Sequence, residues 1–290
     1  MSAAPHDCVS LRGGLTPALA GGSVEKQKPC RFRSGFGVWR ERMEDAFSRS
    51  RMLFGADNMR KLSDAKIAIF GIGGVGGYAA EALARSGIGS LVLVDHDTVS
   101  RSNLNRQIIA LNSTLGRCKV DVMADRIRDI CPETRVEARR CFYLPETADQ
   151  FDFSEYSYVI DAVDTVTAKL EIIQRAKECR VPVISSMGAG NKTDPSMFRV
   201  ADISQTSVCP LARVMRRECR KRGIRDLKVV YSLQEPLRPL EEEKRKEAEA
   251  GDGKERASVR RKDTPGSTVF APAAAGLTLA WAVVQDLIGW

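Results

Sequence analysis

The sequence lacks the paired cysteines of a zinc-bound or disulfide-built protein. It contains eight cysteines, and no two of them are spaced as CxxC. A chain of 290 residues buries a sizeable core without disulfides, so we expect reduced thiols, a cytoplasmic location and no zinc. The first thirty residues also lack the basic start and apolar core of about 7–15 residues that a secretory signal needs, so export is not indicated.

Glycine and proline are too scarce for a fibrous or low-complexity chain, with 23 Gly and 12 Pro. A content of 43% hydrophobic and 28% charged residues is typical of a globular protein. Basic residues outnumber acidic ones by 45 to 37, which gives a formal net charge of +8. Because such a surface attracts phosphate groups, the composition is compatible with a nucleic-acid partner.

Long hydrophobic runs are also missing, apart from the closing stretch 269–290. This stretch approaches the length of a transmembrane helix, but Gln285 and Asp286 interrupt it and its Ala and Gly residues lower its hydropathy. We therefore expect a buried helix over about 273–287 that packs back on the domain, and no stable membrane insertion.

Between residues 66 and 232, short apolar runs alternate with helical patterns. The pattern predicts strands at 66–70, 91–95, near Val136, 158–161, 181–186 and 228–232, with helices over 78–86, 118–131 and 167–179. This alternation predicts an α/β protein with a doubly wound, Rossmann-like, mostly parallel sheet and helices on both faces.

A glycine-rich loop follows the first predicted strand. Residues 71–76 read GIGGVG and lead directly into a helix, which places backbone N–H groups and the helix N-terminus against a nucleotide phosphate. Asp95 ends the next strand, where a carboxylate accepts hydrogen bonds from ribose hydroxyls. These residues alone also fit a nicotinamide or flavin enzyme, and a purely structural turn capped by Asp95 is the plainer alternative.

Cations and a second acid downstream favour ATP. Arg106 lies in NLNRQ (103–107), Lys119 follows in GRCK (116–119), and Asp164 comes after the strand YVID (158–161). Transfer of an adenylyl group needs positive charge and usually magnesium beside the departing pyrophosphate, whereas a dehydrogenase does not. Taken singly, Arg106 could be a surface ion-pair residue, Lys119 a solvated helix residue, and Asp161 or Asp164 the cap of the next helix.

With these motifs in this order, the sequence resembles the ATP-dependent activating family that includes the ubiquitin-activating enzymes and the bacterial enzymes of thiamine and molybdenum-cofactor synthesis. The resemblance covers about 47–240 and 270–287. It implies an ATP-binding adenylation domain at 41–235. Outside this domain, composition and pattern predict a disordered tail at 1–40, a charged mobile loop at 236–267 and a C-terminal helix at 268–290. The resemblance also implies these nucleotide-binding residues: Gly71, Gly73, Gly74, Gly76, Asp95, Asp97, Asn103 and Gln107.

The resemblance assigns catalysis to Arg106, Lys119 and Asp164, with Asp164 as the Mg²⁺ ligand. The family also uses an arginine upstream of the sheet that usually reaches into the partner subunit's site. Arg49 occupies that place, with Arg51 as the alternative, which implies a homodimer.

FSRSRMLFG (47–55), ISSMGAGNKTDP (184–195) and SVCPLARVMRRECRKRGI (207–224) are similar to the branch of tRNA threonylcarbamoyladenosine dehydratases. That similarity implies adenylation of the threonylcarbamoyl carboxylate on a tRNA adenosine, followed by ring closure with loss of AMP. Cys209 then need not act as a nucleophile and is interpreted as a packed residue. Adenylation of a sulfur-carrier protein's C-terminus, with sulfur-transfer partners, is the nearest alternative, followed by a non-catalytic tRNA-binding protein.

A basic stretch lies beyond the predicted ATP site. Residues 213–228 carry eight Lys or Arg residues against Glu218 and Asp226. A helix there would offer the tRNA backbone a continuous positive face, although a merely solvated face remains the alternative.

Overall fold

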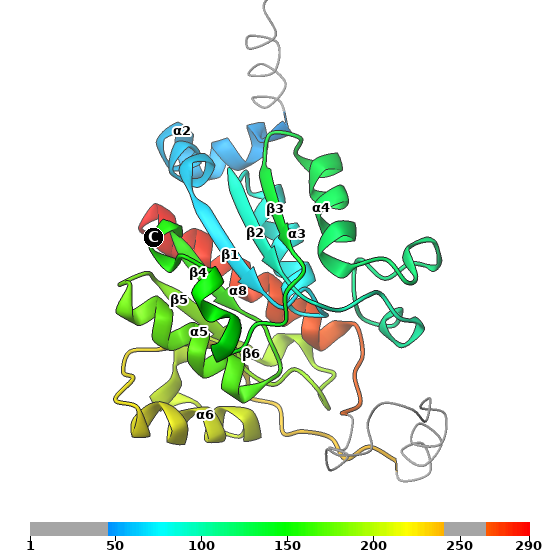
Figure 1. The fold of residues 1–290 in the computed structure, drawn as a ribbon, viewed down its shortest axis with the longest axis vertical. Helices are drawn as coiled ribbons and strands as arrows, with labels where there is room; N and C mark the ends of the chain where they lie inside the picture. Colours follow the sequence, from blue (N-terminus) through cyan, green and yellow to red (C-terminus); the bar gives the residue numbers. More distant parts are fainter. Residues whose placement is uncertain (1–45, 241–264) are drawn as a thin grey trace, which may run out of the picture. The chain divides into compact units, whose positions relative to one another are not determined.

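The computed structural model describes residues 46–240 and 265–290 (Figure 1). The expectations for the tail at 1–40 and for most of the loop at 236–267 fall outside the described residues. The two described ranges together build one unit around a central sheet.

This sheet has seven strands in the order β3-β2-β1-β4-β5-β7-β6. Its strands are β1 (Lys66–Phe70), β2 (Ser90–Val94), β3 (Arg135–Arg139), β4 (Tyr158–Asp161), β5 (Val183–Ser186), β6 (Phe198–Asp202) and β7 (Lys228–Ser232). All neighbouring pairs are parallel except β6 and β7. The chain winds outward from β1 through β2 and β3, then returns to β4, so β1 and β4 flank the point where the strand order reverses.

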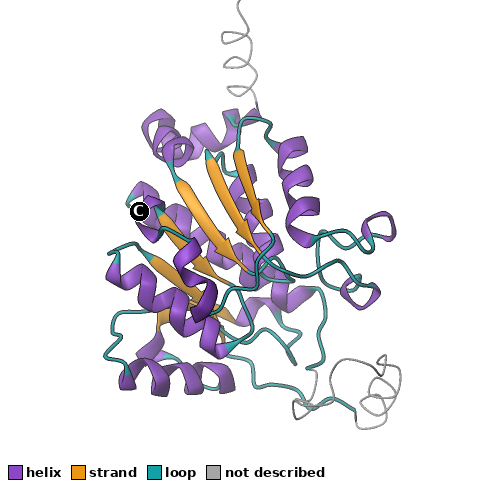
Figure 2. Ribbon diagram, in the orientation of Figure 1, coloured by secondary structure: helices purple, strands orange, loops and turns teal. Residues whose placement is uncertain are grey.

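Helices cover both faces of the sheet (Figure 2). They are α2 (Ser48–Asp64), α3 (Gly76–Arg85), α4 (Lys119–Ile130), α5 (Val166–Glu178), α6 (Pro210–Lys221) and α8 (Phe270–Ile288). Alternate side chains of β1 enter two cores: Ile67 and Ile69 pack with α3, α4 and α8, whereas Ala68 and Phe70 pack with α5 and α6. The continuous apolar strands predicted from the sequence are therefore buried on both faces, as a parallel sheet requires.

The predicted strands and the helices between them are confirmed, with ends that differ by a few residues. Helix α2 and strand β6 were not predicted. In α2 only Leu62 is buried, and Gly55 breaks the helical conformation at φ 79°, so the segment shows no clear apolar period. Strand β6 lies at the edge of the sheet, and its buried and exposed residues do not alternate regularly. Its sequence therefore gives little indication of a strand.

Helix α8 is the predicted C-terminal helix. It is long and apolar enough to cross a membrane, yet 56% of its apolar window is buried inside the described fold. Its Asp286 carboxylate accepts a hydrogen bond from the Tyr158 hydroxyl at 2.6 Å and pairs with Lys228 Nζ at 2.6 Å. A charge held this way ties the helix to β4 and β7, as expected for a core helix.

Candidate functional site

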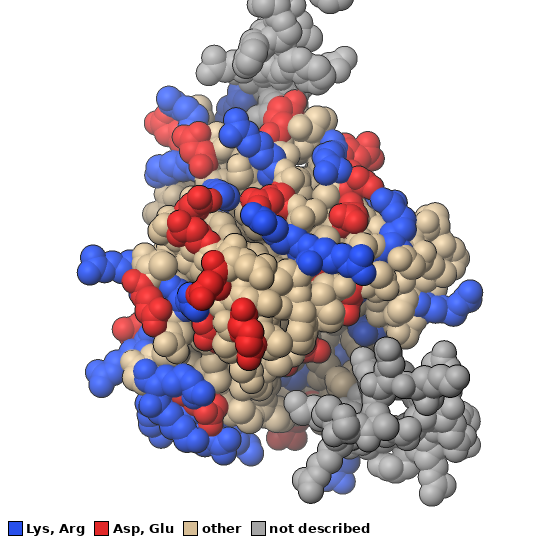
Figure 3. All heavy atoms as spheres, viewed as in Figure 1, with Lys and Arg blue, Asp and Glu red and all other residues tan. Residues whose placement is uncertain are grey.

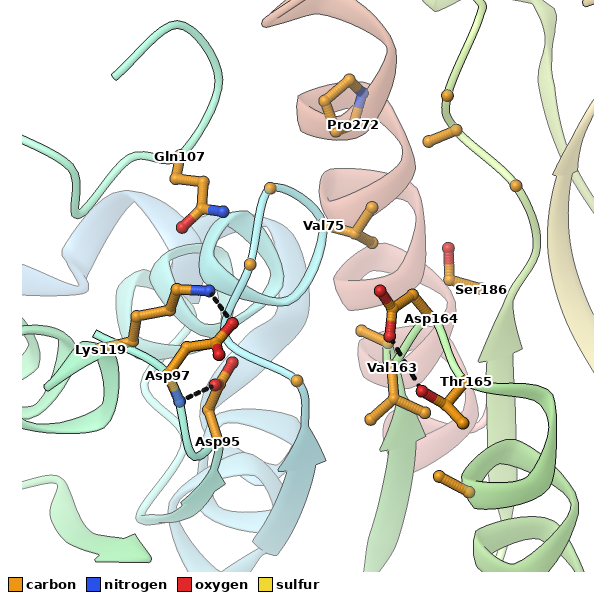
Figure 4. A pocket seen from close by; sticks show the side chains of 18 of the residues that line it. Val75, Asp95, Asp97, Gln107, Lys119, Val163, Asp164, Thr165, Ser186 and Pro272 are labelled. Carbon is orange, nitrogen blue, oxygen red and sulfur yellow. Dashed lines mark hydrogen bonds and ion pairs between the residues drawn. The ribbon is translucent and has the colours of Figure 1, made fainter. Parts of the chain in front are cut away.

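A cleft of about 560 Å³ opens at the carboxyl ends of β1, β2, β4 and β5. This is where parallel sheets bind ligands, because loops diverge at the reversal of strand order. The cleft brings together ten of the twelve predicted site residues: Gly71, Gly73, Gly74, Asp95, Asp97, Asn103, Arg106, Gln107, Lys119 and Asp164. Figure 4 shows Asp95, Asp97, Lys119 and Gln107 along one wall, with Asp164 and Ser186 opposite them.

The glycine loop is shaped by close backbone contacts. Gly71 has a φ of 90°, and a Cβ there would lie 2.7 Å from the Ala162 carbonyl oxygen. A Cβ on Gly76 would lie 1.8 Å from the Gly71 carbonyl oxygen, so α3 begins pressed against the loop. Gly76 itself does not line the cleft. Its observed contact is packing, and its predicted place among the nucleotide-binding residues stays a prediction.

Asp95 holds this loop from the next strand. Its carboxylate accepts hydrogen bonds from the Ile72 N–H at 2.7 Å and from the Asp97 N–H at 2.8 Å. The side chain is half-buried at the end of β2, and each oxygen keeps acceptor capacity. A ribose lying against the loop can therefore find the predicted acceptor here.

A buried lysine stands beside Asp95. Lys119, the first residue of α4, is 5% exposed, and its Nζ lies 2.7 Å from Asp97 Oδ2. Arg106 donates to the Ser102 carbonyl and to Asn105 Oδ1 from the neighbouring loop. The buried Gln107 Oε1 has no hydrogen-bond partner in the described structure. These groups supply positive charge and hydrogen-bonding capacity on the side of the cleft where the sequence predicts the phosphates.

Asp164 is on the opposite wall, three residues beyond the end of β4. The residue before α5 is Thr165, so Asp164 is not the helix cap. Asp164 is exposed to the cleft and accepts a hydrogen bond from Thr165 Oγ1 at 3.2 Å. The predicted cations and the predicted acid therefore face one cavity from different elements.

The far end of the cleft is made by the loop after β5 and the start of α6, including Gly188 and Leu211. Lys192 lies behind this wall, 2% exposed, and its Nζ donates to the Gly188 carbonyl at 2.9 Å. Burial lowers the pKa of Lys192, while the nearby Cys209 thiol opposes that shift. Cys209 is 2% exposed, which agrees with its interpretation as a packed residue.

Arg49 does not reach the cleft of its own chain. It is exposed on α2, which precedes the amino end of β1, whereas the cleft lies at the carboxyl ends of the strands (Figure 1). Its action on a partner's site stays a prediction.

Sequence reasoning missed two aromatic residues at the mouth of the cleft. The rings of His96 and Phe142 lie 4.3 Å apart, and both residues line the cavity next to Asp95. His96 follows Asp95 in the sequence, and Phe142 comes shortly after β3. Their positions just beyond strand ends were therefore the signal from which they could have been predicted. His96, Asp95 and Asp97 also bring ligand atoms within 4.8 Å of one another. Asp97 already pairs with Lys119, and we assign no metal there.

The basic stretch is less continuous than expected. Helix α6 ends at Lys221, and Lys228 lies on β7, where it pairs with Asp286. Arg216 donates to the Thr206 carbonyl at 2.6 Å. Lys and Arg side chains still gather over α6 (Figure 3).

Glu218 lies in the second half of this helix. Its side chain pairs with three cations of the stretch: Arg217, Lys221 and Arg222. Hydrogen bonds from Arg222 and Lys221 lower the pKa of Glu218 to about 2, which keeps it ionised. The positive surface is therefore interrupted by a permanent negative charge.

The fold and the cleft define an α/β protein of the nucleotide-binding type, whose site combines a glycine loop, an acid at the end of β2, two cations and an opposing acid. The model of the ThiF family matches residues 47–289. The chain therefore belongs to the ThiF family, which confirms the expected activating-family fold and membership.

Similar proteins agree with this assignment. A tRNA threonylcarbamoyladenosine dehydratase of Bacillus subtilis is 45% identical over 244 residues, which cover 83% of this chain and 94% of that protein. The Escherichia coli enzyme of the same name is 42% identical over 179 residues, covering 62% of this chain and 65% of its own.

Solved structures show the same fold. The crystal structure of E. coli TcdA in complex with ATP superposes with a TM-score of 0.75 at 31% identity, covering 86% of this chain and 96% of that one. E. coli MccB with ATP, at 16% identity and a TM-score of 0.56, shares the fold alone and covers 84% of this chain and 63% of its own.

Proposed function

We propose that this protein is an ATP-dependent enzyme that dehydrates the threonylcarbamoyl side chain of a tRNA adenosine to its cyclic form. The observation that carries the proposal is the single cleft in which Arg106, Lys119 and Asp164 face the glycine loop. The near full-length similarity to the B. subtilis dehydratase supplies the substrate class. ATP, tRNA and reduced thiols meet in the cytoplasm, which is where we place the enzyme.

The reaction has two steps. A carboxylate oxygen of the substrate attacks the α-phosphorus of ATP, forming an acyl-adenylate and releasing pyrophosphate. A nucleophile within the same side chain then attacks the activated carbonyl, closes the ring and releases AMP, so the net change is loss of water. No cysteine is required, because the second nucleophile belongs to the substrate.

The residues of the cleft divide this work. The glycine loop and Asp95 hold the nucleotide, since Asp95 is already fixed by the Ile72 N–H beside the ribose position. Lys119 and Arg106 stabilise the negative charge that develops on the departing pyrophosphate. The ring pair of His96 and Phe142 forms an aromatic wall next to Asp95, where an adenine ring can stack.

The donors on the Asp164 wall fit magnesium. Mg²⁺ takes oxygen ligands, usually one or two carboxylates together with substrate phosphates, and the exposed Asp164 carboxylate faces the cleft. The hydroxyl of Thr165 adjoins it. When bound, Mg²⁺ neutralises phosphate charge.

A homodimer completes the site. The proposed adenylation uses an arginine of α2. Arg49 does not line the cleft of its own chain, because α2 precedes the amino end of β1 and the cleft lies at the carboxyl ends of the strands. A symmetric dimer allows Arg49 of each copy to act at the partner's cleft. The tRNA backbone binds over α6, whose exposed cations Arg213 and Arg220 lie beyond the Leu211 end of the cleft.

Mass analysis of tRNA nucleosides tests the proposal directly. Incubation of tRNA that carries the open threonylcarbamoyl side chain with the protein, ATP and Mg²⁺ is expected to yield the cyclic nucleoside with one AMP per ring. A sulfur-carrier protein ending in Gly-Gly is the comparison substrate, because an adenylyltransferase and sulfurtransferase of Emericella nidulans is 35% identical over 46% of this chain. ATP–pyrophosphate exchange with the carrier and none with tRNA would favour that activity and its sulfur-transfer partners.

A further inference from the structure

A buried ion pair lies directly beneath the Asp164 wall of the cleft. Lys169 of α5 is 1% exposed and Asp161, at the end of β4, is fully buried. Lys169 Nζ lies 3.0 Å from Asp161 Oδ2. Neither residue lines the cleft, so the reaction steps above do not use them.

The hydrogen-bond partners of this pair come from β5 and from the turn that follows β4. Asp161 Oδ2 also accepts a hydrogen bond from the Ser185 hydroxyl at 2.5 Å, and Lys169 Nζ donates to the Ser186 carbonyl at 2.7 Å. Asp161 Oδ1 accepts a hydrogen bond from the Val163 N–H at 3.2 Å. The network therefore joins β5 and α5 to the backbone of the turn that leads to Asp164.

The same turn touches the nucleotide loop. Ala162 packs so closely on Gly71 that a Cβ on Gly71 would lie 2.7 Å from its carbonyl oxygen. A displacement of residues 162–165 would therefore move the Asp164 wall, whereas the close contact with Gly71 limits movement on the side of the glycine loop. The network fixes one side of this turn, and Gly71 fixes the other.

Stability alone does not account for the pair. Removing two charges from water is costly, and replacing a buried ion pair with apolar residues of similar volume is often neutral or stabilising. Its specific consequence here is geometric, because it gives the Val163 N–H a fixed acceptor one residue before Asp164.

We propose that Asp161, Lys169 and Ser185 are positioning residues that hold the 162–165 turn, and through it Asp164, in the geometry for adenylation. The catalytic part of this inference rests on the proposed function. The structural part does not, because it concerns the turn itself.

Two variants test the proposal without leaving an unpaired buried charge. Asp161→Leu/Lys169→Met/Ser185→Ala replaces the network by apolar side chains, and Asp161→Asn/Lys169→Met keeps the shapes but removes both charges. Hydrogen exchange measured by mass spectrometry reports on the amides of residues 162–166, and thermal unfolding shows which variant retains its fold. We expect exchange there to accelerate by about tenfold in the triple variant, the scale of one lost net hydrogen bond, because Leu offers the Val163 N–H no acceptor. Asp161→Asn keeps an acceptor oxygen, so the double variant should accelerate exchange there less, and exchange over 95–119 should be unchanged in both. Unchanged exchange at 162–166 in a folded variant would overturn the proposal.

Catalysis is measured in a double-mutant cycle with Asp164→Ala. In the wild-type background, the network variants should lower the rate of AMP formation at least about tenfold while the affinity for a fluorescent ATP analogue changes less than about twofold. In the Asp164→Ala background the same substitutions should have little further effect. Equal losses in both backgrounds would show that the network does not act through Asp164. If the wild type forms no AMP with tRNA, the proposed function fails, and the exchange result still decides the positioning of the turn.

Discussion

The cleft and the surface of α6 carry charge in opposite ways. In the cleft, Lys119 is buried and held by Asp97, and Asp95 is fixed by two backbone N–H groups. On α6, Arg213 and Arg220 are exposed, and their side chains form no hydrogen bond or ion pair within the described ranges. A charge held inside a cavity has a fixed geometry and offers a ligand one position. An exposed charge is screened by salt, and its side chain adopts many conformations.

This difference explains what each region can recognise. Fixed, partly buried charges stabilise a particular distribution of charge in a transition state, because they need no reorganisation during the reaction. Exposed arginines on a helix attract any polyanion, with an affinity that depends on salt. Chemical selectivity is therefore expected in the cleft, and the α6 surface contributes affinity for the tRNA backbone.

The largest effect is expected from removing the acid of the cleft. Asp164→Ala should lower magnesium-dependent AMP formation by at least about a hundredfold, because a metal clamp on phosphates contributes several kcal/mol. Steady-state assays over a range of Mg²⁺ concentrations measure the loss. Asp129→Ala, which removes an exposed acid near the end of α4 and away from the cleft lining, is the matched control and should retain activity. Near-normal turnover of Asp164→Ala would remove this residue from the metal site.

A mixing experiment places Arg49. Arg49→Ala and Lys119→Ala subunits are each expected to be inactive alone, yet an exchanged equal mixture should recover about a quarter of wild-type activity, because half of the dimers then contain one intact site. Wild type mixed with the Arg49→Ala/Lys119→Ala double variant should fall to about a quarter of its activity, instead of the half expected if Arg49 acts within its own chain. Arg51→Ala in the same assay tests the alternative arginine. No recovery when Lys119→Ala is mixed with either Arg49→Ala or Arg51→Ala, with subunit exchange demonstrated, would exclude a shared site.

The sequence predicted the cleft better than the α6 surface for a physical reason. Gly71, Asp95 and Asp164 follow the ends of strands, and parallel strands bring their carboxyl ends to one edge, so position along the chain determines position in space. The ion pair of Asp161 and Lys169 could not be predicted, because an acid at a strand end and a lysine on a helix do not reveal that they are buried together.

The charge that the α6 surface presents to solvent depends on the direction in which each side chain points. Arg216 turns toward Thr206 and Lys228 toward Asp286, and no local pattern marks either partner. Helix α2 was not predicted for a related reason. Met52 and Leu53 are apolar but exposed, and Leu62 is the one residue of the helix that is buried, so its apolar residues do not mark a single face.

A smaller effect is expected on α6. Arg213→Gln/Arg220→Gln should weaken tRNA binding and flatten its salt dependence by about 0.7–0.9 log units per log unit of salt for each phosphate that the variant no longer binds. Arg217→Gln/Lys221→Gln removes the same formal charge, but these side chains already share Glu218, so its effect should be smaller. Fluorescence titrations with tRNA at several salt concentrations compare the two pairs. Equal salt slopes in both variants and the wild type would mean that α6 is only solvated.

The smallest effect concerns the buried lysine behind the cleft wall. Burial lowers the pKa of Lys192 from 10.5, so between the lowered pKa and 10.5 the unfolded chain binds more protons at this residue than the folded chain does. The free energy of unfolding contributed by Lys192 therefore rises with pH across that window. Lys192→Met should remove this pH-dependent contribution to the free energy of unfolding. The Tm of the wild type relative to that of the variant should therefore increase as the pH increases from 7 to 10. Thermal scans resolve such a change, since 1 kcal/mol moves Tm by about 2–4 °C in a chain of this size. Lys221→Met, which alters an exposed lysine on α6, should leave the pH dependence as it is in the wild type, and a constant Tm difference for Lys192→Met would show that this lysine is not penalised by its burial.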